Sequence, residues 1–125
     1  MRFFQDSEIR CKCNRPECDA PLALHPLLAQ RLDILRESLG RPLILTSGLR
    51  CAAWNGAQGG APSSRHLTGQ AVDIACDTDA ARYELLAHVL IRPVLLFPFV
   101  ELAPKHLHLD IDDRGPRPLL MLAGG

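Results

Sequence analysis

The sequence predicts an α+β domain with a small, mainly antiparallel sheet and flanking helices. Two segments repeat apolar residues at helical spacing, and several short segments are rich in β-forming residues or alternate apolar with polar ones. The expected order is helix, strand, loop, strand, helix, strand, strand. A length of 125 residues and a hydrophobic content of 47% suit a single domain over 1–125, on which a Cys-containing segment over 1–20 packs.

The first half should hold one long helix and one short strand. Residues 25–39 place leucines at steps of four, three and four, on one helical face, and a glycine follows as a stop signal. These leucines are Leu28, Leu32, Leu35 and Leu39. Residues 42–47 (PLILTS) predict a short buried strand. Residues 48–69, rich in Gly, Ser, Ala and Asn, predict a long irregular segment with one helical turn over 51–55, and such segments are usually functional.

The second half should alternate strands with one further helix. Residues 70–75 (QAVDIA) predict a strand, and Thr78 can cap a helix over 79–91. The core face of that helix is expected to carry Leu85, Leu86, Val89 and Leu90. Two more strands are expected over 96–102 and 106–111.

Charge and hydropathy restrict the partners and the setting. Fourteen basic and fourteen acidic residues cancel, which argues against nucleic-acid or anionic-membrane binding. No segment approaches the roughly 18 apolar residues of a membrane span, and the N-terminus lacks the apolar stretch of a signal peptide. We expect a soluble monomer made in the cytoplasm, which acts elsewhere only after release.

The five cysteines cannot all pair within one chain. Without an export signal, free thiols or metal ligands are more common than a disulfide framework. Cys11, Cys13 and Cys18, with a fourth thiolate from Cys51 or Cys76, would form a closed structural zinc site. Their C-x-C-x4-C spacing differs from a zinc-ribbon knuckle, which favours buried thiols or one disulfide that ties down the N-terminal segment.

The last expected strand, KHLHLDI, carries the residues most suggestive of chemistry. Alternation points its three aliphatic residues, from Leu107 to Ile111, to one face. The other face carries His106, His108 and Asp110. A solvated face would more often carry Lys, Thr, Glu or Ser, so this pattern favours metal binding or proton transfer.

A second polar group lies in SRHLTGQAVDI. Alternation directs Val72 and Ile74 to the core and Asp73 to the opposite face. Gly69 permits a tight reversal, so His66 can approach Asp73. Alone, a loop histidine and a surface acid explain these two residues. Together with the His-x-His strand they supply three or four ligands of the kinds that zinc prefers, and three ligands with an open position suit catalysis.

These motifs resemble those of the zinc D-Ala-D-Ala peptidases. Residues 64–73 (SRHLTGQAVD) fit that family's S-x-H-x-x-G-x-A-x-D pattern, and residues 46–50 (TSGLR) are similar to its T-S-G-Y-R. Further matches are Asn55, Gly59, Gly60, His106 and His108. The opening FFQDSEIRCKC is similar to that of small phage-type members, and the resemblance covers residues 3–110.

The resemblance implies a fold shared with the Sonic hedgehog signalling domain and a zinc metallopeptidase that cuts peptidoglycan stem peptides, of the D-Ala-D-Ala or L-Ala-D-Glu type. It assigns zinc to His66, Asp73 and His108. Arg50 would grip the substrate's carboxylate or polarise its carbonyl. Without a signal peptide or a wall-binding domain, a phage lysis (endolysin) or tail-associated enzyme is favoured over a resident secreted one.

One position departs from the family. Many members carry Asp or Glu as general base three residues before the last zinc-binding histidine, where this chain has Lys105. His106 is the best-placed substitute, with Glu101 and Asp110 as alternatives, and Asp110 could instead orient a ligand imidazole.

Two other functions stay open on the sequence alone. The missing acid favours a non-catalytic zinc-binding module of hedgehog-like fold, and a cytoplasmic enzyme of another class, such as an amidohydrolase, is the third interpretation. If the protein is a peptidase, residues 51–65 and 92–105 are expected to build its substrate pocket.

Overall fold

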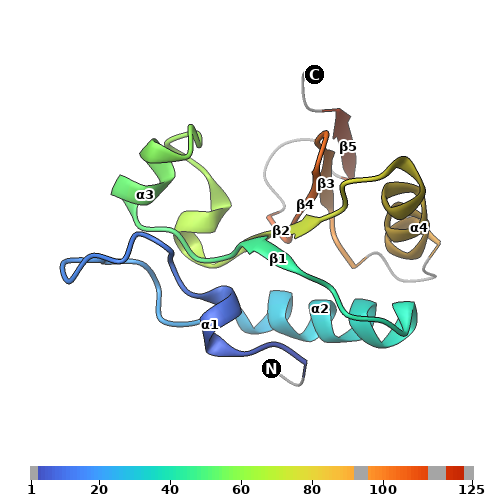
Figure 1. Cartoon of the computed structure of the whole chain (residues 1–125), viewed down its shortest axis with the longest axis horizontal. Helices are drawn as coiled ribbons and strands as arrows, with labels where there is room; N and C mark the ends of the chain where they lie inside the picture. Colours follow the sequence, from blue (N-terminus) through green and yellow to red (C-terminus); the bar gives the residue numbers. More distant parts are fainter. Residues whose placement is uncertain (1–2, 92–95, 113–117, 123–125) are drawn as a thin grey trace.

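A computed structural model of the chain describes residues 3–91, 96–112 and 118–122. Within these ranges five strands form one sheet in the order β1-β2-β4-β3-β5 (Figure 1). The strands are β1 (Leu45–Ser47), β2 (Ala71–Ala75), β3 (Phe99–Leu102), β4 (His106–Asp110) and β5 (Leu119–Leu122). All neighbours pair antiparallel except β3 and β5, which are parallel. The α+β class and the mainly antiparallel sheet are thus confirmed.

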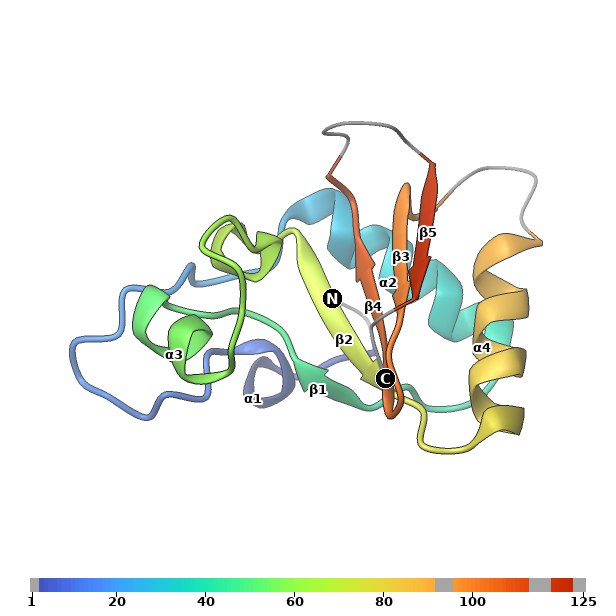
Figure 2. The same cartoon turned by 90° about the horizontal axis from the view of Figure 1, so that it is seen from above.

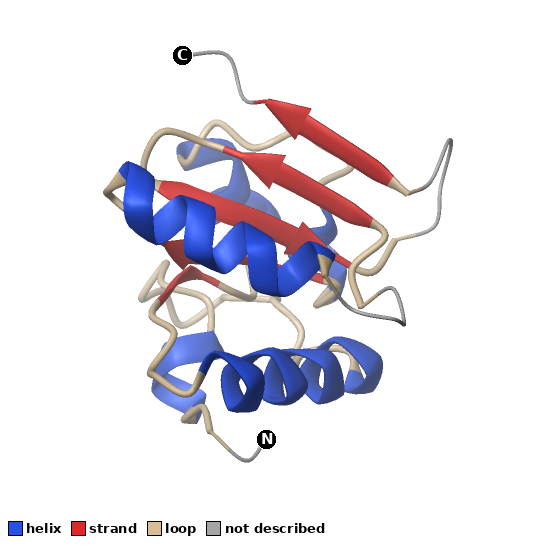
Figure 3. Ribbon diagram, turned by 90° about the vertical axis from the view of Figure 1, so that its right-hand side faces the viewer, coloured by secondary structure: helices blue, strands red, loops and turns tan. Residues whose placement is uncertain are grey.

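Helices surround this sheet. They are α1 (Asp6–Ile9), α2 (Pro26–Leu39), α3 (Ala52–Ala57), the 3-10 helix η1 (Arg65–Thr68) and α4 (Asp79–Leu90). Figure 3 shows α4 crossing in front of the sheet and α2 beneath it. None of the helices in the described part of the chain has the length and apolar character needed to cross a bilayer.

The core lies between one face of the sheet and helices α2 and α4. The leucine spacing in α2 predicts its buried face correctly, since Leu28, Leu32 and Leu35 are 0% exposed and Leu39 is partly buried. They belong to one apolar cluster with Leu107 and other sheet residues. Burying one such side chain contributes about 1.5–3 kcal/mol, so this face fixes the helix against the sheet.

Helix α4 starts as predicted, because the Thr78 hydroxyl accepts a hydrogen bond from the backbone N–H of Ala81 at 3.1 Å. Leu85 and Val89 are buried, as expected. The expectation that Leu90 also faces the core is wrong, since it is 50% exposed. At 3.6 residues per turn, Leu90 lies about 100° around the helix axis from Val89 and about 140° from Leu85, so its side chain points away from the buried face.

The structure differs from the prediction mainly at element ends. Strands β1 and β3 begin at Leu45 and Phe99, three residues later than expected. The preceding apolar residues Leu43 and Phe97 are buried without being strand residues, so hydrophobicity alone extends the predicted strands too far. The sequence did not predict α1, η1 or β5. Residues 92–95 of the expected substrate pocket lie outside the described residues.

Candidate metal centre

A row of paired residues crosses the sheet on the face opposite the core. Ser47 pairs with Asp73, Asp73 with His108, and His108 with Glu101. Residues directly opposite each other on neighbouring strands project from the same face. Four strands therefore bring together a hydroxyl, two carboxylates and an imidazole that lie up to 61 positions apart in the chain, from position 47 to position 108.

Strand β4 has the predicted register. Leu107 and Leu109 are 0% exposed and lie in the core. His106, His108 and Asp110 alternate with them and occupy the other face. Because a slip by one residue would exchange the two faces, this arrangement confirms the alternation seen in the sequence.

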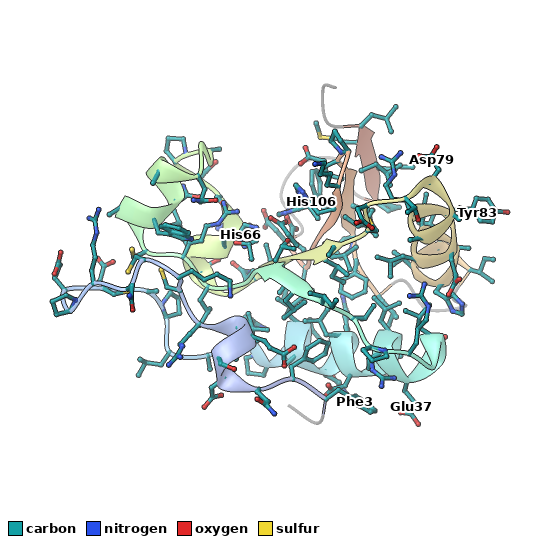
Figure 4. All side chains as sticks on the ribbon, viewed as in Figure 1. Phe3, Glu37, His66, Asp79, Tyr83 and His106 are labelled. Atoms are coloured by element: carbon teal, nitrogen blue, oxygen red, sulfur yellow. The ribbon has the colours of Figure 1, made fainter. Side chains whose placement is uncertain are left out.

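Helix η1 brings His66 to the same place. The Ser64 hydroxyl accepts a hydrogen bond from the backbone N–H of His66, and Gly69 ends the turn with φ at 74°, a left-handed conformation that favours glycine. The chain then enters β2 directly. As expected, the reversal places His66 next to Asp73, where the histidine is only 2% exposed. Figure 4 shows His66 and His106 on the side of β2 that faces away from α2.

Two imidazoles converge on one oxygen of Asp73. Nε2 of His66 lies 3.2 Å and Nδ1 of His108 lies 2.9 Å from Oδ1 of Asp73. The other nitrogen of each ring also makes a hydrogen bond. Nδ1 of His66 donates to the carbonyl of Gly48 at 2.7 Å, and Nε2 of His108 donates to Oδ2 of Asp110 at 3.0 Å. Partners of this kind fix the tautomer and orientation of ligand imidazoles.

The carboxylates of the centre favour a bound positive charge. Burial would raise the pKa of Asp73, but hydrogen bonds from His108 and His66 outweigh it and hold that pKa well below its ordinary value. Burial would likewise lower the pKa of His108, yet its bonds to Asp110 and Asp73 raise it to about 9. The two buried carboxylates therefore stabilise positive charge on the ring between them, and a metal ion can supply that charge in place of a proton.

The donor set fits zinc. His66, Asp73 and His108 each offer one ligand atom, and these atoms all lie within 4.8 Å of one another. Two imidazole nitrogens and a carboxylate oxygen are donors that zinc accepts, and three protein ligands leave a fourth position for a reacting group. The structure thus brings together the three residues for which the sequence suggested this role.

Arg50 is fixed beside the same carboxylate. Its Nε donates to the Ser47 hydroxyl at 2.9 Å, one terminal nitrogen donates to Oδ1 of Asn55 at 3.1 Å, and the other lies 3.4 Å from Oδ2 of Asp73. Asn55 is 3% exposed and also donates to the carbonyl of Ala61. No role for Ser47 or Asn55 was predicted from the sequence. The T-S-G-L-R and N…G-G matches contained them, but only the fold shows that both hold the guanidinium.

The remaining polar residues occupy distinct positions. The His106 side chain is 37% exposed, with Nε2 at 3.8 Å from Oδ2 of Asp73, outside the group of three ligand atoms. Asp110 is 5% exposed and accepts from both His108 and the backbone N–H of Asp112. Lys105 is exposed just before β4. Asp110 is therefore placed to orient an imidazole, whereas His106 is open to solvent.

Comparison with known proteins agrees with this chemistry. A search of curated sequences finds no significant match. The family model described as Peptidase M15 matches residues 2–110, which include every residue of the centre described above. Peptidases of this family depend on zinc, and the group formed by His66, Asp73 and His108 suits that ion. The chain therefore belongs to the peptidase M15 family of zinc-dependent peptidases.

Proposed function

We propose that the protein hydrolyses peptide bonds in peptidoglycan stem peptides, with one zinc ion held by His66, Asp73 and His108. The observation that carries this proposal is the convergence of two imidazole nitrogens on Oδ1 of Asp73, each ring being fixed from behind. Residues 64–73, which resemble the motif of the D-Ala-D-Ala peptidases, supply two of the three ligands. Three such ligands would hold the zinc ion and leave its fourth coordination position for water or substrate.

Residues around the zinc site would bind the substrate, transfer the proton and orient a ligand. When bound, zinc supplies Lewis-acid polarisation of the scissile carbonyl and lowers the pKa of a coordinated water. Among the described residues, Arg50 uses three of the five N–H donors of its guanidinium, so two remain for a substrate carboxylate or carbonyl oxygen. His106 holds and transfers a proton at Nε2, which lies 3.8 Å from Oδ2 of Asp73 on a side chain that is 37% exposed. Asp110 keeps the His108 ring in place.

The position of Arg50 beside the proposed zinc ion indicates the kind of substrate. An arginine fixed beside the metal suits a substrate with a carboxylate close to the scissile bond, which both D-Ala–D-Ala and L-Ala–D-Glu bonds offer. We place the enzyme in phage lysis or in a phage tail, where it acts as a monomer on the cell wall after release. Residues 1–125 are taken as one domain.

Purified peptidoglycan tests this function directly. The zinc-loaded protein should release products whose masses identify the bond that is cut, and a chelator should abolish that release until zinc is restored. A bond other than the two named would correct the substrate while leaving the peptidase intact. No product from any stem peptide would refute the proposal, and a non-catalytic zinc module would then be the better account of an exposed Lys105.

Substitution of Gly60 tests whether turnover depends on the held position of Arg50. A Cβ atom at Gly60 would fall inside contact distance of the Asn55 amide and at 3.0 Å from Arg50, so Gly60→Ala must displace the group that holds the guanidinium. We expect turnover to fall on the order of 10²-fold, as for a misplaced catalytic group, with zinc content unchanged.

Its matched control is Gly56→Ala. Gly56 lies within α3 with no atom near its missing Cβ, so alanine there should leave turnover normal and favour the helix. Turnover by Gly60→Ala equal to that of the Gly56→Ala control would show that the held position of Arg50 is dispensable.

A further inference from the structure

Four cysteines gather at a second place, outside the centre described above. They are Cys11, Cys13, Cys18 and Cys51, and their Sγ atoms all lie within 4.8 Å of one another. The loop between α1 and α2 brings three of them beside the start of α3, as two views at right angles show (Figures 1 and 2). We propose that these four thiolates bind a second zinc ion, which is structural.

The sulfur geometry supports a metal rather than a disulfide. Sγ of Cys11 lies 3.7 Å from Sγ of Cys51, far beyond the bond length of about 2.05 Å in a disulfide. Four sulfurs at about 2.3 Å from one zinc ion lie about 3.8 Å apart at the corners of a tetrahedron. The observed separation thus matches one edge of a zinc–thiolate site.

Two of the four sulfurs accept hydrogen bonds from backbone N–H groups. The backbone N–H of Cys51 donates to Sγ of Cys11, and that of Trp54 donates to Sγ of Cys51, both at 3.4 Å. Hydrogen bonds to charged acceptors are the stronger kind, so these donors favour the ionised sulfurs. Three of the cysteines, Cys11, Cys13 and Cys18, line a surface pocket. Arg10, Lys12 and Arg15 line it too, and their positive charges offset the net negative charge that four thiolates leave around one Zn²⁺. Four soft ligands with no open position are typical of structural zinc.

The positions of Cys51 and Cys76 identify Cys51 as the fourth ligand of the proposed site. Cys51 caps α3 within the cluster, whereas Cys76 is buried beside the backbone of Lys105 and is absent from the group. The sequence left this choice open and favoured buried thiols or one disulfide. It could not show that the segment after Arg50 folds back against residues 11–18.

The location gives the second zinc a defined role. Cys51 follows Arg50 directly, and the backbone N–H of Leu49 donates to the carbonyl of Ile9 at 2.8 Å. A Cβ atom at Gly48 would meet that same carbonyl at 2.6 Å, so the N-terminal segment packs closely on residues 48–51. These residues supply Arg50 and the carbonyl that orients His66. A metal on the cysteines would therefore brace the segment on which the first centre rests.

Zinc content of the full chain, purified under reducing conditions, tests the proposal. We expect two zinc ions per chain in the wild type and one in Cys18→Ser, whose cysteine is the more exposed member of the cluster. Cys76→Ala removes a cysteine outside the cluster and should keep both ions. Asp73→Asn should lose only the ion of the first centre, so failure of one site is distinguishable from failure of the other.

Two further measurements guard against variants that fail to fold, because each also gives a result on the wild-type protein. A mercurial reagent that caps thiols should release one of the two zinc ions. Cobalt substitution should give sulfur-to-metal charge-transfer absorption that Asp73→Asn retains and Cys18→Ser loses. A wild type with a single zinc that mercurial leaves in place, or cobalt-loaded protein without the sulfur band, would overturn the second site.

Discussion

Asp73→Asn is expected to remove the zinc of the first centre and all measurable peptidase activity. Oδ1 of Asp73 is the point on which His66 and His108 converge, and an amide keeps the shape of the side chain without its charge. Loss of an outer partner of a metal ligand reduces affinity or activity by roughly 10- to 100-fold. Loss of a charged ligand should exceed that range. Elemental analysis and the peptidoglycan assay measure the two effects.

The asparagine variant is preferable to alanine for a physical reason. Asp73 is 5% exposed and pairs with Arg50, so both variants lose a buried ion pair, which destabilises a protein by about 3–5 kcal/mol. Asparagine, unlike alanine, leaves no cavity and keeps an oxygen that can accept a hydrogen bond from Arg50. Asp79→Asn is the matched control, because that carboxylate is 95% exposed and pairs only with Arg82 among the ion pairs of the described residues. Unchanged zinc content in a folded Asp73→Asn protein would show that Asp73 is not a ligand.

His106→Ala should lower turnover by roughly 10²–10⁴-fold, the range for a lost general acid–base group. The His106 ring is exposed enough to meet a substrate and stands 3.8 Å from Oδ2 of Asp73, yet it lies outside the group of ligand atoms. Zinc content should therefore stay at the wild-type value. This combination separates a proton-handling residue from a ligand, for which both quantities fall together.

Glu101→Gln is the parallel experiment. Glu101 lies directly opposite His108 in the β3–β4 pairing and on the same face, so its carboxylate is an alternative to His106 for the acid that Lys105 replaces. A large loss in Glu101→Gln with a mild effect of His106→Ala would move the role to Glu101. His88→Ala, on α4, is the control for removing an imidazole. Normal rates in both test variants would contradict both assignments.

The parts of the fold that depend on local pattern are predictable from the sequence. Helix α2 follows from its leucine spacing, α4 from its Thr78 cap, and the register of β4 from strict alternation. Each of these signals comes from residues within a few positions of one another. The three proposed zinc ligands also lie in such segments, so the sequence could suggest them together with the family resemblance.

What the sequence could not supply depends on contacts between distant segments. Strand β5 (Leu119–Leu122) pairs with β3 in parallel, a partnership that no local pattern specifies. The contact of Arg50 with Asp73, 23 positions later in the chain, needs the loop after β1 to fold back on the sheet. The gathering of Cys51 with cysteines 33 to 40 positions earlier has the same origin. Burial of Leu43 outside any strand shows in turn that apolar character does not fix strand ends.

The row of residues across β1, β2, β4 and β3 ties metal affinity to the folding equilibrium. Ser47, Asp73 and His108 meet only when three strands are paired, so the unfolded chain offers no comparable site. A ligand that binds only the native state adds RT ln(1 + [L]/Kd) to the free energy of unfolding, about 2.7 kcal/mol at a hundredfold excess over Kd. The thermal midpoint of this small domain is thus a function of free zinc, and the chain resists unfolding most where the metal is available.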